Sequence, residues 1–397
     1  MSDNQKDYTS QLKGTITDAI KNVKELNQSF ITNVLMFMIF LLLVVLILYF
    51  FYMYNLDSRE CKIFNKLYSS LDNRISNLNF DTDEDCNYCF RDYYISTAFN
   101  CLSGGSYKND YVSSSGCVLK NILKQGVRCL DFEIYSVDNA PVVATSTTDD
   151  YYIKETYNSI PFSEVMATVA TNAFSSSTAP NYKDPIILHF RFKSANQNMY
   201  TNLATILKAY NNILLGPEYS YEYNICTEQN DSCYSRNLGD VKLKDLKGKI
   251  IIIVDRSNIS FIDNKDFYEY VNMTSNSMFM RCLRYYDVQF TPDIDELTNY
   301  NKKSMTIAIP DTGSNPNNPS GIIARAMGCQ MVAMRYQVFD ENLQENIMFF
   351  DKVGYGFVLK PEKLRYIPVF INETPPNDPL LNFESRTLEK DYYKFDI

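Results

Sequence analysis

Hydrophobic and polar residues follow different patterns in different parts of the chain. Residues 1–30 are mostly polar, and a few side chains are spaced for one face of a helix, namely Leu12, Ile16, Ile20, Val23 and Asn27, which predicts a polar helical tail. From Val34 to Met53 every residue is apolar or aromatic. A helix of that length spans roughly 30 Å, the thickness of the bilayer core. We therefore expect one transmembrane helix over residues 31–54.

This segment has the features of a retained signal anchor. A cleaved signal peptide has a shorter apolar region and small residues at its cleavage site, whereas here about thirty residues precede the span and bulky aromatic residues follow it. Tyr49, Tyr52 and Tyr54 stand where an interfacial aromatic belt belongs. The sequence predicts a single-pass protein that contacts the membrane through Val34–Met53.

The cysteines indicate on which side of the membrane the C-terminal part lies. Lys and Arg residues near the two ends of the span are equal in number, so the positive-inside rule does not choose an orientation. All ten cysteines follow the span, and an even number favours an oxidising compartment. We expect the C-terminal part to be non-cytosolic. Its disulfide candidates are Cys86 with Cys89, which alternatively remain thiols, and Cys226 with Cys233.

Strand-like apolar runs alternate with helix-like segments after a predicted helical stalk over residues 57–87. The runs lie at 128–135, 141–145, 186–192, 249–255, 305–310 and 329–337. Such alternation is typical of a parallel sheet with crossover helices, and one barrel of this kind takes ~250 residues. Residues 258–279 break the pattern and are predicted to link two half-barrels. The tail, 367–397, is expected to wrap the barrel surface.

Composition excludes two classes of function. The net charge is -9 and the pI is about 4.9, and an acidic surface repels nucleic acid. The chain has one histidine, His189, so no mechanism can use one imidazole as general base and another as general acid.

Several motifs, in order, resemble eukaryotic phosphoinositide-specific phospholipase C. The segments ISTAFNCLSGG (95–105), LKQGVRCLDFEIY (123–135), PVVATSTT (141–148), PIILHFRFK (185–193) and LKGKIIIIVD (246–255) resemble its X half, and GCQMVAMRYQ (328–337) with GYGFVLKPEKLR (354–365) resembles its Y half. The resemblance implies an α/β fold, a distorted TIM-type barrel with an X-like half over 88–257 and a Y-like half over 280–366.

The resemblance also implies a calcium-dependent site whose chemistry is missing here. The family uses two histidines to move protons, and the matching positions are Phe99 and Thr145, neither of which titrates near neutral pH. Three of four metal-ligand positions keep ligand-type side chains, Asn100, Asp131 and Glu133. The fourth is Arg191, a permanent cation. We expect Arg191 to pair with Asp131 and Glu133; the alternative is a residual weak calcium site.

The residues that bind ring phosphates in the family are also replaced. The lysine positions after the KGKI motif are Ile253 and Asp255, and the arginine position before the Y-half IYP is near Ile307. Each lost charge-assisted hydrogen bond is worth roughly 1.5–3 kcal/mol, so phosphorylated inositol lipids are not expected to bind in the family manner. His189 is expected to be a hydrogen-bonded core residue.

Two functions fit these substitutions. The first is a membrane-anchored pseudoenzyme whose barrel binds a protein or lipid partner or serves as a structural unit, without a cofactor. The second is a divergent phosphodiesterase that uses Asp131 and Glu133 as acid and base, with Arg191 on the phosphate.

Overall fold

The computed structural model describes the chain except for residues 1–2, 70, 72, 115, 150–151, 221–223, 227–232, 236, 369–384, 386 and 397. Its centre is a nearly closed barrel of eight parallel strands in the order β10-β11-β12-β1-β2-β5-β8-β9. The strands are β1 (Tyr93–Ala98), β2 (Cys129–Val137), β5 (Ile186–Phe192), β8 (Ile250–Asp255), β9 (Met273–Ser275), β10 (Met280–Arg284), β11 (Met305–Ile309) and β12 (Met331–Met334). The expected TIM-type fold is confirmed.

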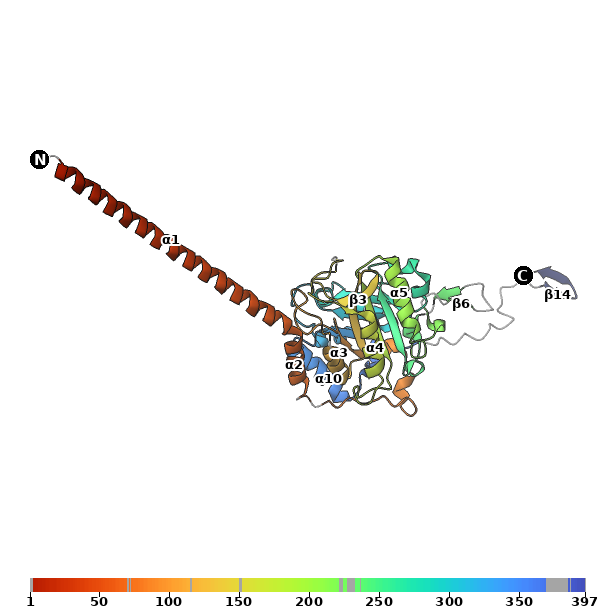
Figure 1. Ribbon diagram of the computed structural model, residues 1–397. Coiled ribbons are helices and arrows are strands. Elements are labelled where there is room, and N and C mark those ends of the chain that lie inside the picture. The colour runs from red at the N-terminus through yellow and green to blue at the C-terminus, as the bar shows by residue number, and fades with distance from the viewer. Residues whose placement is uncertain are drawn as a thin grey trace.

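Helices follow most barrel strands and cover the outside of the sheet (Figure 1). They are α3 (Cys117–Lys124), α4 (Phe162–Asn172), α5 (Gln197–Lys208), α6 (Lys265–Tyr268), α7 (Tyr285–Gln289), α8 (Ile294–Lys303), α9 (Gly321–Ala326) and α10 (Glu341–Val353). The ends of α10 show the local signals: the Asp340 side chain accepts a hydrogen bond from Leu343 N, and Gly354 ends the helix at φ +86°.

Three short strands extend the barrel sheet, β3 (Ala140–Ala144), β4 (Ile160–Pro161) and β13 (Phe357–Leu359). All pair antiparallel, β3 with β2, β4 with β3, and β13 with β1. The chain also forms two separate hairpins, β6 (Asn224–Cys226) with β7 (Cys233–Ser235) and β14 (Thr387–Lys390) with β15 (Tyr393–Asp396).

Alternation of side chains along the strands produces two hydrophobic layers. One layer fills the barrel and includes Ile187, Ile251, Ile253 and Ile307. The other lies between the sheet and the helices and includes Ile186, Leu188, Ile250 and Ile252. The apolar runs are continuous because both faces of each strand are buried.

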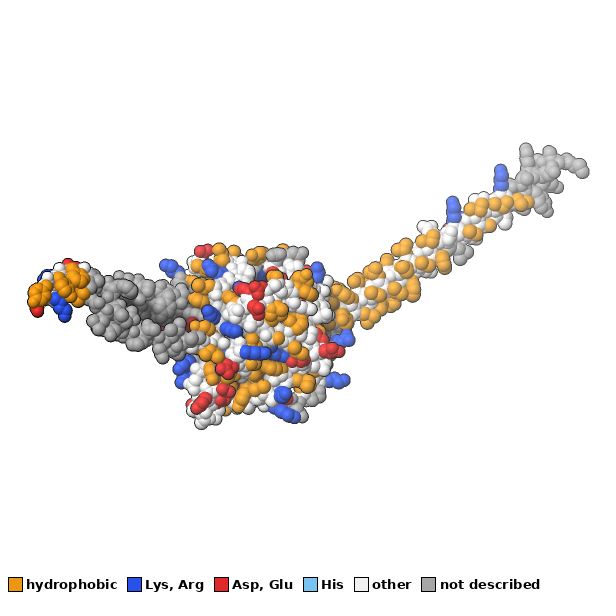
Figure 2. Space-filling model, turned by 180° about the vertical axis from the view of Figure 1, so that it is seen from behind, with side chains coloured by type: hydrophobic (Ala, Val, Ile, Leu, Met, Phe, Trp, Pro, Cys, Tyr) orange, Lys and Arg blue, Asp and Glu red, His pale blue; other side chains and the backbone are white. Residues whose placement is uncertain are grey.

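Helix α1 (Asp3–Tyr54) joins the polar tail and the apolar segment in one continuous helix, which projects from the barrel in Figure 1. Its stretch Leu12–Tyr54 contains a window long and apolar enough to cross a membrane. Figure 2 shows hydrophobic side chains covering the part of α1 next to the barrel, and basic side chains toward its far end.

The expected stalk over residues 57–87 is different in the structure. Helix α2 (Leu56–Ser69) ends well before residue 87, and its Phe64 and Tyr68 are buried in the barrel-to-helix core. A disulfide between Cys61 and Cys117 joins α2 to the start of α3. The segment is part of the globular domain because its apolar face packs on the barrel.

The other disulfide candidates are not all bonded as expected. Cys86 and Cys89 are free thiols, and the Cys86 side chain is buried, so that pairing is wrong. The backbones of Cys226 and Cys233 lie directly opposite each other in the β6–β7 hairpin. Their side chains are outside the described residues, and that pairing stays a prediction.

One further segment differs from expectation. Residues 258–279 contain α6 and β9, and β9 pairs with β8, so the expected linker is part of the barrel. Residues 369–384 of the tail are outside the described residues. The β14–β15 hairpin is exposed along both strands, and wrapping of the barrel by the rest of the tail stays a prediction.

The buried face of α2 generates a stability prediction. Phe64 is 2% exposed, so we expect Phe64→Ala to lower the free energy of unfolding by about 3–5 kcal/mol. The neighbouring Ile63 is 57% exposed, and Ile63→Ala is the matched control, with an expected change within about 0.5 kcal/mol. Denaturant unfolding of the full chain in detergent micelles measures both; equal effects would mean that α2 is not part of the core.

Candidate active site

The residues singled out by sequence meet at the carboxyl ends of neighbouring barrel strands. Asn100 follows β1, with a left-handed backbone at φ +45°. Asp131 and Glu133 lie two apart on β2 and pair in register with His189 and Arg191 on β5. Alternate residues of a strand face the same side, so all four of these β2 and β5 side chains meet inside the barrel.

The guanidinium of Arg191 contacts all three ligand-type side chains. Its Nη2 donates to Asp131 Oδ1 at 2.8 Å and to Asn100 Oδ1 at 2.9 Å, and its Nη1 donates to Glu133 Oε1 at 2.9 Å. Its Nε donates to Asp131 Oδ2 at 3.0 Å. Arg191 is 3% exposed. The expected ion pair with Asp131 and Glu133 is therefore confirmed.

The other oxygens of the two carboxylates also have partners. Asp131 Oδ2 lies 2.7 Å from His189 Nδ1, and Glu133 Oε2 accepts from Tyr135 Oη at 2.8 Å and from Ser146 N at 2.9 Å. Burial alone would raise the pKa of Asp131, but Arg191 and His189 outweigh it and hold that pKa below its ordinary value. The carboxylate of Asp131 is therefore charged at neutral pH.

This donor set does not fit a calcium ion. Calcium takes six to eight oxygen ligands, whereas here the oxygens of Asn100, Asp131 and Glu133 are bonded to a cation that already lies between them. A metal at this place would first have to displace the Arg191 guanidinium from all three side chains. Among the described residues, no group of three or more His, Cys, Asp or Glu side chains is arranged to hold a metal.

The two histidine-equivalent residues have packing roles. Arg191 lies over the ring of Phe99, with 4.4 Å from Cζ to the ring centroid, a cation–π contact. Thr145 is buried, and its Oγ1 donates to the carbonyl of Tyr107 at 3.2 Å. Neither Phe99 nor Thr145 has a group that titrates near neutral pH, so neither can transfer a proton.

Sequence reasoning missed the residues that close the barrel mouth. The ring of Tyr107 packs edge-on against Phe99 at 5.9 Å, and the guanidinium of Arg335 lies 4.6 Å from the Tyr107 ring. Arg284 forms an ion pair with Asp149, and both line the same mouth as Phe99 and Tyr107. The cavity left in this mouth is only about 10 Å³. Arg335 was visible within the motif GCQMVAMRYQ, but nothing in the sequence places it beside Tyr107.

His189 is a buried, fully bonded core residue, as expected. Its Nδ1 faces Asp131, and its Nε2 lies 2.9 Å from Ser275 Oγ. The ring is 0% exposed. Both ring nitrogens are engaged inside the barrel, so His189 has no open position from which to act on a substrate.

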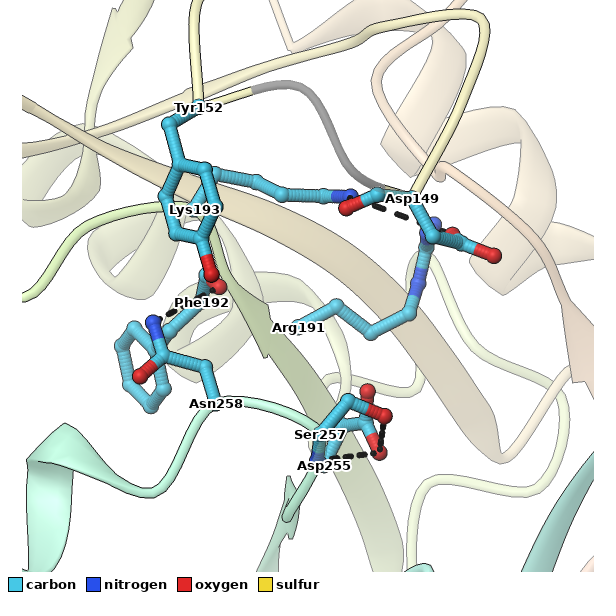
Figure 3. Close-up of a pocket in the computed structure, with 8 residues that line it drawn as sticks. All are labelled: Asp149, Tyr152, Arg191, Phe192, Lys193, Asp255, Ser257 and Asn258. Atoms are coloured by element: carbon cyan, nitrogen blue, oxygen red, sulfur yellow. Dashed lines mark hydrogen bonds and ion pairs between the residues drawn. The ribbon is translucent and has the colours of Figure 1, made fainter.

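An open pocket of about 300 Å³ lies beside the closed mouth. Figure 3 shows its lining, in which Lys193 and Asp149 approach each other on one side and Asp255 bonds Ser257 on the other. Of the phosphate-binding positions, Asp255 lines this pocket, whereas Ile253 and Ile307 are buried in the barrel. The wall therefore has an acid, Asp255, at one family phosphate-binding position, while its cations are Arg191 and Lys193.

An eight-stranded parallel barrel with its polar residues at the carboxyl strand ends is a TIM-type barrel. Two sequence profiles match consecutive parts of the chain: phosphatidylinositol-specific phospholipase C, X domain, at residues 86–256, and its Y domain at residues 254–363. Together they cover most of the protein. The chain belongs to the phosphatidylinositol-specific phospholipase C family.

Solved structures support the fold. The crystal structure of L. pealei PLC21 is 19% identical with a TM-score of 0.55, and that of S. officinalis PLC21 is 18% identical with the same TM-score. Each match covers 73% of this chain and 39% of the other chain, so this protein corresponds to well under half of those phospholipases. No curated protein sequence matches the chain.

The contacts of Arg191 generate the second prediction. Removing it leaves two buried carboxylates without their cation, so Arg191→Ala is expected to lower the free energy of unfolding by about 3–5 kcal/mol. Arg74 forms an ion pair with Asp351 but is 78% exposed, and Arg74→Ala is expected to cost under about 1 kcal/mol. The measurement is denaturant unfolding of the full chain; a silent Arg191→Ala would contradict the assigned network.

Proposed function

We propose that this protein is a membrane-anchored pseudoenzyme of the phospholipase C family. One observation carries the proposal: Arg191 occupies the centre of the family's metal-ligand positions and bonds Asn100, Asp131 and Glu133. The family chemistry needs a metal there to stabilise a charged phosphate. With a structural cation in that place, the barrel is free to serve as a binding or structural domain.

The closed mouth of the barrel is a second observation that supports the same proposal. A substrate must reach the reacting groups, but the mouth is filled by Phe99, Tyr107 and Arg335. Opening it would break the contacts among these side chains and expose the buried charges beneath them. The edge-to-face rings and the guanidinium groups on them therefore stabilise the barrel at the expense of substrate access.

A divergent phosphodiesterase is the alternative, and the geometry disfavours it. General acid and base groups need pKa values near the working pH, whereas Arg191 and His189 keep the pKa of Asp131 low. Glu133 is 2% exposed and accepts hydrogen bonds on both oxygens. Arg191 uses four of its five N–H donors on these two acids and Asn100, and its Nη1 also lies 3.6 Å from a further carboxylate, Asp149.

The membrane anchor of the proposal is α1. Its apolar segment has the length of a bilayer crossing, and it is followed at once by α2, which belongs to the barrel domain. In this topology the barrel lies directly at the membrane surface. A lipid or protein partner would meet it there.

We propose that the barrel lies on the non-cytosolic side. The Cys61–Cys117 disulfide supports this side because such bonds persist in oxidising compartments. The two cysteines are 56 residues apart in the sequence, so the bond closes a long loop. By the chain-entropy account, a loop of that size stabilises the fold by roughly 4 kcal/mol.

The third prediction tests the loss of activity. Full chain reconstituted in vesicles that contain phosphatidylinositol is expected to release no inositol phosphate at any calcium concentration up to millimolar, because neither histidine position can move a proton. An active phospholipase C on the same vesicles is the positive control. Calcium-dependent release that Asp131→Ala abolishes would overturn the proposal.

The melting temperature with and without calcium tests independently whether the site binds the metal. Wild-type protein is expected to keep its melting temperature when millimolar calcium is added. Arg191→Glu should melt lower without calcium, because three acids then share the site. It should recover several degrees with calcium, because binding to the folded state alone adds stability. A rise of several degrees in the wild type would mean that its site binds the metal.

The fourth prediction concerns topology. Protein trapped with a thiol-alkylating reagent in intact cells is expected to carry the Cys61–Cys117 disulfide, and an N-terminal tag should be digested by protease added to the cytosolic side. Flotation with membranes is measured in parallel. Fully reduced cysteines together with flotation would reverse the orientation and leave the anchor in place, whereas loss of flotation would remove the anchor.

A further inference from the structure

One face of α1 before the apolar segment carries a hydrophobic stripe that no other part of the described structure covers. The stripe includes Ile16, Ile20, Val23 and Phe30, whose side chains are between 52% and 67% exposed. From Ile16 onward the stripe advances by four and three residues in turn, through Ile20, Val23, Asn27, Phe30 and Val34. This is the heptad spacing of a coiled coil.

The spacing assigns each residue to a heptad position. A step of three runs from a to d and a step of four from d to a, so the d positions are Ile16, Val23 and Phe30. The a positions are Ile20, Asn27 and Val34. The two-stranded state is assigned from Asn27, because a single Asn at an a position specifies both register and oligomeric state at a cost in stability. The β-branched residues at a (Ile20, Val34) and at d (Ile16, Val23) would, without Asn27, favour three or four strands.

We propose that this stripe binds the same stripe of a second copy of the chain, forming a parallel, in-register coiled-coil dimer. The proposal rests on the proposed membrane anchor in one respect: two chains that cross the bilayer in the same direction present their helices parallel. In that arrangement Asn27 meets Asn27 of the second copy, and the amide groups can hydrogen-bond instead of being buried alone.

The continuity of α1 argues against the membrane surface as the occupant. The helix runs unbroken from Asp3 to Tyr54, and Figure 1 draws it as one straight rod. A stripe in line with a transmembrane segment projects away from the bilayer and cannot lie flat on it without a kink, which Pro, Gly or a bulge would normally supply. Residues 15–54 contain neither Pro nor Gly.

No charged residue between Ile16 and Val34 stands at an a or d position, the positions that form the seam between the two helices. Asp18 and Glu25 fall at f positions and Lys21 at a b position, all on the outer side of the helix; Lys24 is at e, beside the seam. The shared membrane raises the effective concentration of the two helices.

Disulfide cross-linking in purified, reconstituted full chain tests the seam. All ten native cysteines follow the apolar segment, so an introduced cysteine before it is the only thiol on its side of the bilayer. Ile20→Cys and Val23→Cys are expected to form at least fivefold more oxidised dimer than Asn22→Cys and Ser29→Cys, which lie at c positions. Equal cross-linking at all four positions, or none, would overturn the proposal.

A charge in the seam separates the dimer from the anchor. Ile20→Glu with Val23→Glu should abolish the dimer in sedimentation and in cross-linking through Phe30→Cys, while flotation with vesicles stays at the wild-type level. Asn22→Glu with Ser29→Glu is the matched control and should leave the dimer intact. A dimer that survives the seam charges contradicts the proposal. Failure of wild-type flotation would instead remove the anchor from the proposed function.

Asn27 provides the test of register. Asn27→Ile is expected to strengthen association and to allow species larger than dimers, because the polar contact that specifies two strands is lost. Sedimentation velocity of the full chain in micelles distinguishes the species. Unchanged dimers in Asn27→Ile would place Asn27 outside the seam and overturn the in-register assignment.

Discussion

Two buried carboxylates on one strand repel each other and need a cation between them. Asp131 and Glu133 meet that need with Arg191 from the neighbouring strand, which is paired in register with Glu133. A bound metal can leave, but a guanidinium is covalently part of the fold. The barrel therefore has a permanent counter-charge between its two central carboxylates. The same permanence removes the open coordination position that a phosphate would need.

The substitutions around the site depend on one another, because each aromatic ring contacts a guanidinium group. An imidazole at position 99 would lie against Arg191, and its protonated form would be repelled, whereas the electron-rich face of Phe99 attracts the guanidinium. Tyr107 and Arg335 repeat the same contact one step farther across the mouth. The two rings contact each other and each carries one cation, Arg191 on Phe99 and Arg335 on Tyr107, so reverting one position alone would leave a guanidinium without its aromatic partner.

The fold class was predictable because buried strands and ordered motifs are local features of the sequence. The Arg191 network was predictable for the same reason, since strand alternation places residues two apart on one face. The contact of Tyr107 with Arg335 joins residues 228 apart, and only the folded barrel brings them together. The Cys61–Cys117 bond was missed because connectivity does not follow from cysteine count. The α2 segment has an apolar face, but its pattern does not say what it packs against.

A single residue, Asn55, separates α1 from α2, and α2 is held to the barrel by buried aromatic side chains and a disulfide. A domain on a flexible tether explores a volume that grows with the length of its linker. This barrel has almost no tether and explores almost none. In the proposed topology it cannot reach toward an opposing membrane. Its encounters are then governed by lateral diffusion and by how densely the protein populates its own bilayer.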